Sequence, residues 1–176
     1  MLKNIWLQGI IRFKMNHVTP PFKHSPRQIT FRPNALVLSI RPTYVERILS
    51  GLKTVELRRR FPRPAANSTA LIYSTSPVQA IVGYAIIEEV SQLSLRALWR
   101  RFARAADVTR EEFDNYFSGV ETGCALRLTK VCVFDSPMHL SDLTRNFKFS
   151  PPQSYCYWRG AMPATAHGRV KTTARR

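Results

Sequence analysis

Short apolar runs separated by polar turns recur along the chain from residue 35 onward. The runs are rich in Val, Ile, Leu and Tyr, which favour strands, and Pro or Gly stands between several of them. Gly83, inside one run, is a candidate β-bulge. The pattern therefore predicts a protein built mainly of short strands. The predicted strands cover residues 35–40, 54–58, 70–74, 81–90 and 124–134, with a last one around Tyr155 and Tyr157.

Other stretches have the helical period instead. Residues 93–106 place apolar side chains on one face, and arginines cover much of the remaining surface. Thr109, followed by Glu112 three positions later, has the pattern of a capping box and predicts the start of a second helix. Gly119 is expected to end that helix, and residues 140–143 predict a further helical turn.

The order of these elements predicts the α+β class: a small β-barrel of five to six mostly antiparallel strands with inserted short helices. We expect one domain over residues 35–160. Residues 1–34 form a basic, proline-rich arm and residues 161–176 a basic tail without pattern, and both are expected to be disordered.

The charge balance is the most unusual property of the composition. The chain has 27 Lys and Arg against 11 Asp and Glu, a formal net charge of +16. Residues 1–34 and 161–176 contain basic residues and no acid, so the middle of the chain retains +6. A surplus of this size attracts polyanions, nucleic acid before an acidic membrane. Solubility alone is the alternative explanation for the basic ends.

Cysteine and histidine spacing gives little sign of metal chemistry. Cys124, Cys132 and Cys156 form no C-x-x-C pair, and the histidines are scattered. Unpaired thiols favour a reducing compartment, so a cytoplasmic protein is expected. We expect no metal and no cofactor. No apolar run approaches the roughly 18 residues of a membrane helix, so no membrane partner is expected.

The segment GLKTVELRRR, residues 51–60, concentrates charge in one short stretch. A short helix over residues 44–50, with Thr43 as its cap, is predicted to stop at Gly51, a residue that tolerates left-handed backbone. The strand that follows alternates. Val55 and Leu57 are expected on one face, and Thr54, Glu56 and Arg58 on the other.

These residues resemble the ASCH domain, a branch of the PUA-like superfamily. The family pattern G-x-K-x-x-E-x-R is met by Gly51, Lys53, Glu56 and Arg58, and the resemblance covers roughly residues 35–159. The ending PPQSY, from residue 151, is similar to a subgroup described as transcriptional regulators. The resemblance implies a PUA-like barrel with a cleft beside the motif.

The resemblance also implies RNA binding. Some family members cleave RNA, and others remove the acetyl group from N4-acetylcytidine. The deacetylating branch has a threonine three positions after the motif lysine. This chain has Glu56 there, which argues against that activity.

The candidate site residues have more than one role open to them. Lys53 could contact phosphate or act as a base, and Glu56 could act as a general base, accept from a nucleobase amino group, or simply pair with an arginine. Arg58 is the best anion contact because guanidinium suits bidentate phosphate binding. The further nucleic-acid-binding candidates are Arg60, which could share that face, Tyr73, which could stack a base or pack in the core, and Ser76, which could donate to phosphate or cap a turn.

Three functions remain open from the sequence. The leading hypothesis is a regulatory RNA-binding protein whose cleft is formed by Lys53, Glu56 and Arg58. The alternative is a hydrolase of RNA or of a modified nucleoside, with Lys53 and Glu56 catalytic. DNA-binding transcriptional control is the third. Arginines at residues 96–104 offer a second basic surface for a nucleic-acid backbone or an acidic protein. The sequence leaves the oligomeric state open.

Overall fold

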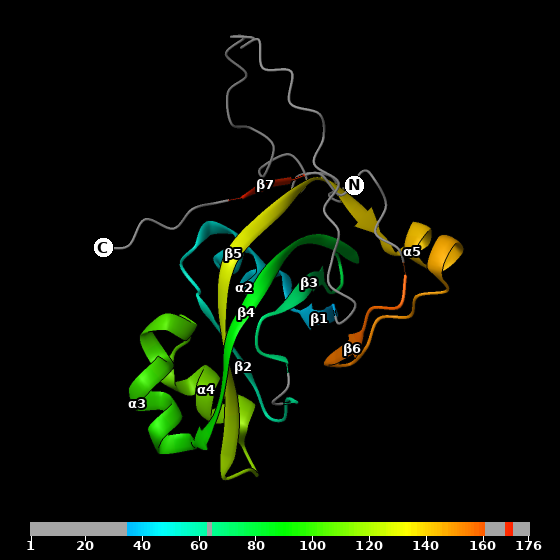
Figure 1. The fold of residues 1–176 in the computed structure, drawn as a ribbon. Coiled ribbons are helices and arrows are strands. Elements are labelled where there is room, and N and C mark those ends of the chain that lie inside the picture. Colours follow the sequence, from blue (N-terminus) through cyan, green and yellow to red (C-terminus); the bar gives the residue numbers. More distant parts are fainter. Residues whose placement is uncertain (1–34, 63–64, 161–167, 171–176) are drawn as a thin grey trace, which may run out of the picture.

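The computed structural model describes residues 35–62, 65–160 and 168–170 and shows an α+β fold (Figure 1). Seven strands and four helices are present in this part of the chain. They follow the order β1 Leu36–Ile40, α2 Pro42–Ser50, β2 Val55–Arg58, β3 Ser68–Ser74, β4 Ala80–Ser94, α3 Leu95–Ala106, α4 Arg110–Phe117, β5 Thr122–His139, α5 Leu140–Phe147, β6 Tyr155–Tyr157 and β7 Gly168–Val170.

The strands form a single mixed sheet that curls strongly into a half-barrel (Figure 1). Its order is β2-β5-β4-β3-β1-β6, with β7 beside β5. Only β1 and β3 pair in parallel among the described strands, so the prediction of a mostly antiparallel sheet is confirmed. The strands β2 and β6 are the two ends of the strand order. No backbone ladder joins these two strands in the described structure, which leaves a seam between them.

Gly83 marks the irregular part of the long β4–β5 ladder. The register shifts between Ile81 and Gly83 and twice more along the pair, which lets these long strands bend. A Cβ atom placed on Gly83 would lie 2.2 Å from the backbone oxygen of Cys132, closer than real contacts allow. The predicted bulge at Gly83 is therefore confirmed, and the residue is needed for the close approach of the two backbones.

Both faces of the sheet are covered, which places three apolar clusters around it. One cluster joins the β1 side chains Leu36 and Leu38 to α2, and a second lies on the opposite side of β1 and β3 near α5. The third packs α3 and α4 against Val55 and Leu57 of β2. The alternation predicted for β2 is thus confirmed, because these two residues face the helices.

The predicted helices are present with shifted ends. Helix α2 begins at Pro42 with Arg41 at the N-cap position, so the prediction of a Thr43 cap was wrong. Proline favours the first helical position because its backbone angle is already helical and it has no N–H to satisfy. Gly51 ends α2 in the left-handed conformation (φ 85°), as predicted. Thr109 and Glu112 form the predicted capping box of α4.

The strand β7 was not predicted, since it lies in the stretch read as a patternless tail. It pairs antiparallel with β5 from Cys132 to Phe134. The predicted basic arm at 1–34 and the rest of the predicted tail lie outside the described residues. In the part of the chain that is described, no helix is long and apolar enough to cross a membrane.

Candidate functional site

The turn after α2 positions the charged motif of residues 51–58. The Gly51 N–H donates to the carbonyl oxygen of Ile48, and the Lys53 N–H donates to that of Arg47 (2.9 Å), so the chain folds back tightly. The Thr54 N–H then donates to the carbonyl oxygen of Ala105 (2.9 Å), which ties the motif to the end of α3. The strand β2 starts directly afterwards and presents alternate side chains to opposite faces.

Lys53, Glu56 and Arg58 converge in a buried ion network. The Glu56 carboxylate lies between the two cations: Lys53 Nζ is 3.5 Å from Oε2, and an Arg58 terminal nitrogen is 3.1 Å from Oε1. The exposed fractions of the three residues are only 2%, 7% and 5%. Of the roles left open for Glu56, the structure shows the pairing with an arginine, and it adds an ion pair with the motif lysine. The sequence-predicted grouping of these three residues is what the structure shows.

Lys53 has an environment that disfavours its charge. Its ammonium donates to the carbonyl oxygen of Ala106 (2.7 Å) and lies 5.2 Å from the ring centroid of Tyr44. Burial lowers the pKa of Lys53 below the ordinary 10.5, and the nearby Glu56 carboxylate opposes this without reversing it. A lysine with a lowered pKa can exchange a proton more easily near neutral pH.

Arg58 connects the two sides of the seam in the half-barrel. It comes from β2, and its terminal nitrogens donate to the carbonyl oxygen of Ser39 in β1 (3.0 Å) and to the carbonyl and hydroxyl oxygens of Ser154, just before β6 (3.2 and 3.3 Å). Its Nε–H is buried without a hydrogen-bond partner in the described structure. Arg58 thus contacts Glu56 and both edges of the sheet at once, and its Nε–H donor is not used in these contacts.

Two tyrosines border the network. The Tyr44 hydroxyl donates to Glu112 of α4 (3.2 Å) while its ring lies against Lys53. Burial and the Glu112 carboxylate raise the pKa of Tyr44. The pKa of Tyr116 is also raised, mainly by burial; the Arg58 charge opposes the rise and the Glu56 charge adds to it. Tyr116 is 43% exposed, so solvent reaches it at the border of the network.

Comparison with known proteins shows which family this chain belongs to. A family described as a domain of unknown function (DUF365) matches residues 33–145. A curated ASCH domain-containing ribonuclease from Zymomonas mobilis is 36% identical over 124 residues, which cover 70% of this chain and 83% of the relative. The chain belongs to the ASCH-domain family.

Solved structures agree with this assignment. The crystal structure of ASCH from Zymomonas mobilis matches the ASCH domain with a TM-score of 0.66 at 34% identity, covering 73% of this chain and 90% of that one. A tyrosine-to-phenylalanine and a serine-to-alanine variant of the Zymomonas protein match with TM-scores of 0.66 and 0.67. The α+β fold and its curled sheet are therefore shared with that protein.

These relatives also sharpen the functional expectations. The curated relative is described as a ribonuclease, which favours the RNA-hydrolase alternative over a purely regulatory RNA-binding role. The expected subgroup of transcriptional regulators has no support among these relatives.

The remaining predicted site residues lie away from the network. Tyr73 is 2% exposed and packs against Phe149 in the second apolar cluster, so its ring has no free face for a base. Ser76 is exposed in the turn that follows β3. Arg60 is exposed two residues beyond the end of β2. The structure therefore brings together Lys53, Glu56 and Arg58 and leaves these three residues elsewhere.

Three residues at the ASCH site were not among the sequence candidates. Tyr44 comes from α2, Tyr116 from α4, and Ser154 precedes β6. Each reaches the motif through tertiary packing. The helical spacing of Tyr44 before Gly51 was visible in the sequence, but a helical tyrosine close to apolar neighbours is ordinarily a packing residue. In the part of the chain that the structure describes, no group of three His, Cys, Asp or Glu residues could hold a metal ion.

Proposed function

We propose that this ASCH-domain chain binds RNA and cleaves it at the network of Lys53, Glu56 and Arg58. The observation that carries the proposal is the likeness to the Zymomonas ASCH ribonuclease, which extends over 83% of that protein's length at 36% identity. The TM-score of 0.66 at 34% identity supports a shared fold around the motif.

The charge of the network suits an anionic substrate. Two cations share one carboxylate in the described structure, so the network carries one excess positive charge when Lys53 is protonated. An uncompensated charge at a buried position is costly, and an incoming phosphate oxygen or the loss of the Lys53 proton would relieve that cost. Both responses are useful for phosphodiester cleavage.

Cleavage of RNA requires a group that takes a proton from the attacking hydroxyl, a group that gives one to the leaving oxygen, and positive charge near the phosphate. Lys53, with its lowered pKa, is the proposed proton-exchanging group. Glu56 orients the Lys53 ammonium, and Arg58 fixes Glu56 in turn. Arg60, exposed beyond β2, is proposed to contact the RNA backbone.

A tyrosine and a serine touch this network, as Tyr44 lies over Lys53 and Ser154 accepts from Arg58. These are the same residue types that are substituted in the two Zymomonas variant structures. The deacetylase alternative is less well supported, because Glu56 stands where that branch has a threonine and is engaged by both cations.

The test is the cleavage of an end-labelled single-stranded RNA by the wild type and by Lys53→Met, followed on a denaturing gel. We expect the substitution to reduce the cleavage rate by about 100-fold or more, the usual size of a lost acid–base group. Lys148→Met is the matched control, since Lys148 is exposed after α5. The variants are purified in parallel to reveal contaminating nuclease. Equal cleavage by wild type and Lys53→Met would refute the proposal.

A further inference from the structure

Three arginines form an exposed stripe along α3. Arg96, Arg100 and Arg104 are four residues apart and therefore lie on one side of the helix, which we call the arginine stripe. All three are exposed, while Leu98 and Phe102 on the opposite side are buried in the third apolar cluster. The stripe spans about 12 Å at the usual helical rise.

The stripe is distinguished from its neighbours by its lack of partners. Arg101, on the same helix, pairs with Glu89 of β4 (3.6 Å) and lies over the ring of Phe102. Among the residues that the structure describes, the stripe arginines have no ion pair and no hydrogen-bond acceptor. Like charges four residues apart disfavour a helix, so an external anion would stabilise this one.

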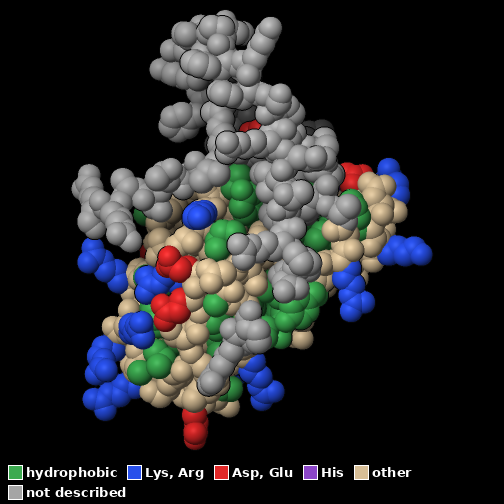
Figure 2. Space-filling model, in the orientation of Figure 1, with side chains coloured by type: hydrophobic (Ala, Val, Ile, Leu, Met, Phe, Trp, Pro, Cys, Tyr) green, Lys and Arg blue, Asp and Glu red, His purple; other side chains and the backbone are tan. Residues whose placement is uncertain are grey.

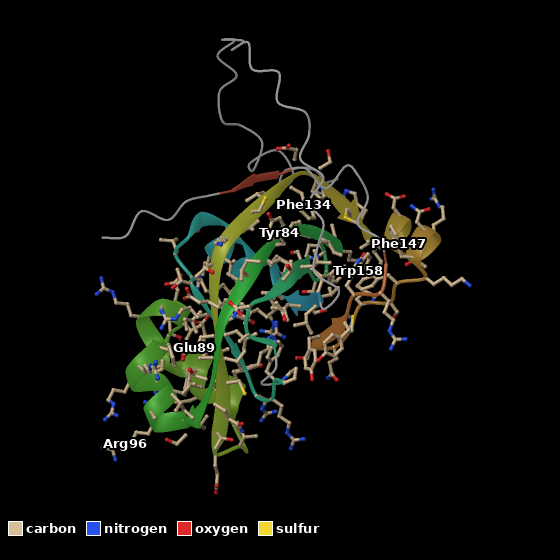
Figure 3. The ribbon with its side chains drawn as sticks, in the orientation of Figure 1. Tyr84, Glu89, Arg96, Phe134, Phe147 and Trp158 are labelled. Atoms are coloured by element: carbon tan, nitrogen blue, oxygen red, sulfur yellow. The ribbon has the colours of Figure 1, made fainter. Side chains whose placement is uncertain are left out.

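The figures show the same distribution of charge. Lys and Arg side chains gather at the lower left of Figure 2, where Figure 1 places α3. In Figure 3 the Arg96 side chain points away from the sheet, whereas Glu89 lies on β4, over the sheet itself. The stripe therefore faces the outside of the molecule.

The helix that carries the stripe ends on the proposed catalytic network. The carbonyl oxygens of its last two residues, Ala105 and Ala106, accept from the Thr54 N–H (2.9 Å) and from Lys53 Nζ (2.7 Å). A nucleic-acid strand bound along α3 toward the C-terminus of the helix would thus reach the helix end that contacts Lys53. The arginine stripe thus combines unpaired, regularly spaced cations with a helix that contacts the motif directly.

We infer that the arginine stripe binds the phosphate backbone of single-stranded RNA and leads it to the Lys53 network, an inference that rests on the proposed function. Guanidinium groups bind phosphate through two parallel hydrogen bonds. A row of them suits single-stranded RNA, which carries one negative charge per nucleotide. A flexible single strand can follow a helix edge and still bend toward the motif.

The test compares Arg96→Gln/Arg100→Gln/Arg104→Gln with a control that removes three charges near α5, Arg145→Gln/Lys148→Gln/Arg159→Gln. Glutamine keeps helix propensity, and α5 lies across the sheet from α3 in Figure 1. Binding of a fluorescein-labelled oligouridine is measured by anisotropy between about 50 and 200 mM salt. Each phosphate contact adds about 0.7 to the log–log salt slope, so the stripe variant should have a slope shallower by about 2.

Over this salt range the wild type should then lose roughly 20-fold more affinity than the stripe variant, and the control should behave as the wild type. The stripe variant should also cleave a tetranucleotide at the wild-type rate but show a raised KM on a 20-residue RNA. The inference would be overturned if the stripe variant kept the wild-type salt slope or if the control variant changed its slope equally. It would also be overturned if the stripe variant lost binding to polyglutamate, which stands for an acidic protein, and still bound RNA as the wild type does.

The two proposals fail separately in this experiment. If the wild type cleaves RNA but the salt slope is the same in the stripe variant, the inference about the stripe is overturned and the nuclease proposal stands. A stripe-dependent slope without any cleavage supports the stripe and removes the nuclease proposal. Absence of RNA binding by the wild type at about 50 mM salt overturns both.

Discussion

Replacing Glu56 with glutamine tests whether the buried network is held together by one carboxylate. Glu56 contacts Lys53 and Arg58 at 3.5 and 3.1 Å, and all three residues are buried. Glu56→Gln preserves the shape and leaves two buried cations without a counter-charge. Removing one partner of a buried ion pair destabilises a protein by about 3–5 kcal/mol. In a chain of this size each kcal/mol lowers Tm by about 2–4 °C, so we expect a fall of about 6–20 °C.

The loss of stability caused by Glu56→Gln should depend on pH because Lys53 can release its proton. The pKa of Lys53 is already below 10.5 in the folded chain, so between the folded and unfolded values the unfolded chain binds more protons. Stability therefore rises with pH through that window. Glu56→Gln removes an attraction that raises the Lys53 pKa, which extends the window to lower pH. The Tm deficit of Glu56→Gln should consequently narrow as the pH is raised.

Thermal unfolding followed by circular dichroism at pH values from about 6 up to the ordinary lysine pKa of 10.5 measures both effects. Glu46→Gln is the control, because Glu46 is exposed on α2. The double variant Lys53→Met/Glu56→Gln should be more stable than Glu56→Gln alone, since it removes one of the uncompensated charges. A Glu56→Gln loss below about 1 kcal/mol, or a deficit that is constant with pH, would refute this account of the network.

The remaining predictions concern the scaffold of the ASCH domain. Gly83→Ala should destabilise the chain by about 1–3 kcal/mol, because its Cβ would lie 2.2 Å from the Cys132 backbone oxygen; unchanged chemical denaturation would contradict the packing described for β4 and β5. Thr109→Ala should cost about 1 kcal/mol through loss of the capping box with Glu112. The same denaturation series checks this, and Thr43→Ala is its comparison, because Thr43 is exposed on α2 and is not the cap of that helix.

Local sequence signals identified the centre of the site well. Gly51 as a helix stop was sufficient to place Lys53 just after the turn, and the alternation of Val55 and Leu57 to place Glu56 and Arg58 together on the other face. These features depend on residues within one turn or one strand, where backbone geometry fixes the direction of each side chain.

The signals failed where the outcome depends on distant partners. Tyr73 was a candidate for base stacking, but alternation cannot distinguish the two faces of a sheet that is covered on both, and its ring packs on Phe149. The contact of Arg58 with Ser154 depends on strand order, including the parallel pairing of β1 with β3, which period and propensity do not encode. The attachment of α3 to Lys53 was invisible for the same reason.

The seam between β2 and β6 has a consequence for how the domain opens. Elsewhere the described strands are joined by ladders of backbone hydrogen bonds, but here side chains make the connection: the Arg58 guanidinium group, and the Phe61 ring beyond β2, whose centroid lies 4.9 Å from that of Tyr155 in β6. A partial opening that parts these two edges breaks few bonds, so amide hydrogens beside it should exchange before those of the central strands β3 and β4. Arg58 therefore contributes both to the ion network with Glu56 and to the contact between the two sheet edges. Release of this one side chain would therefore loosen the ion network and the contact between the sheet edges together.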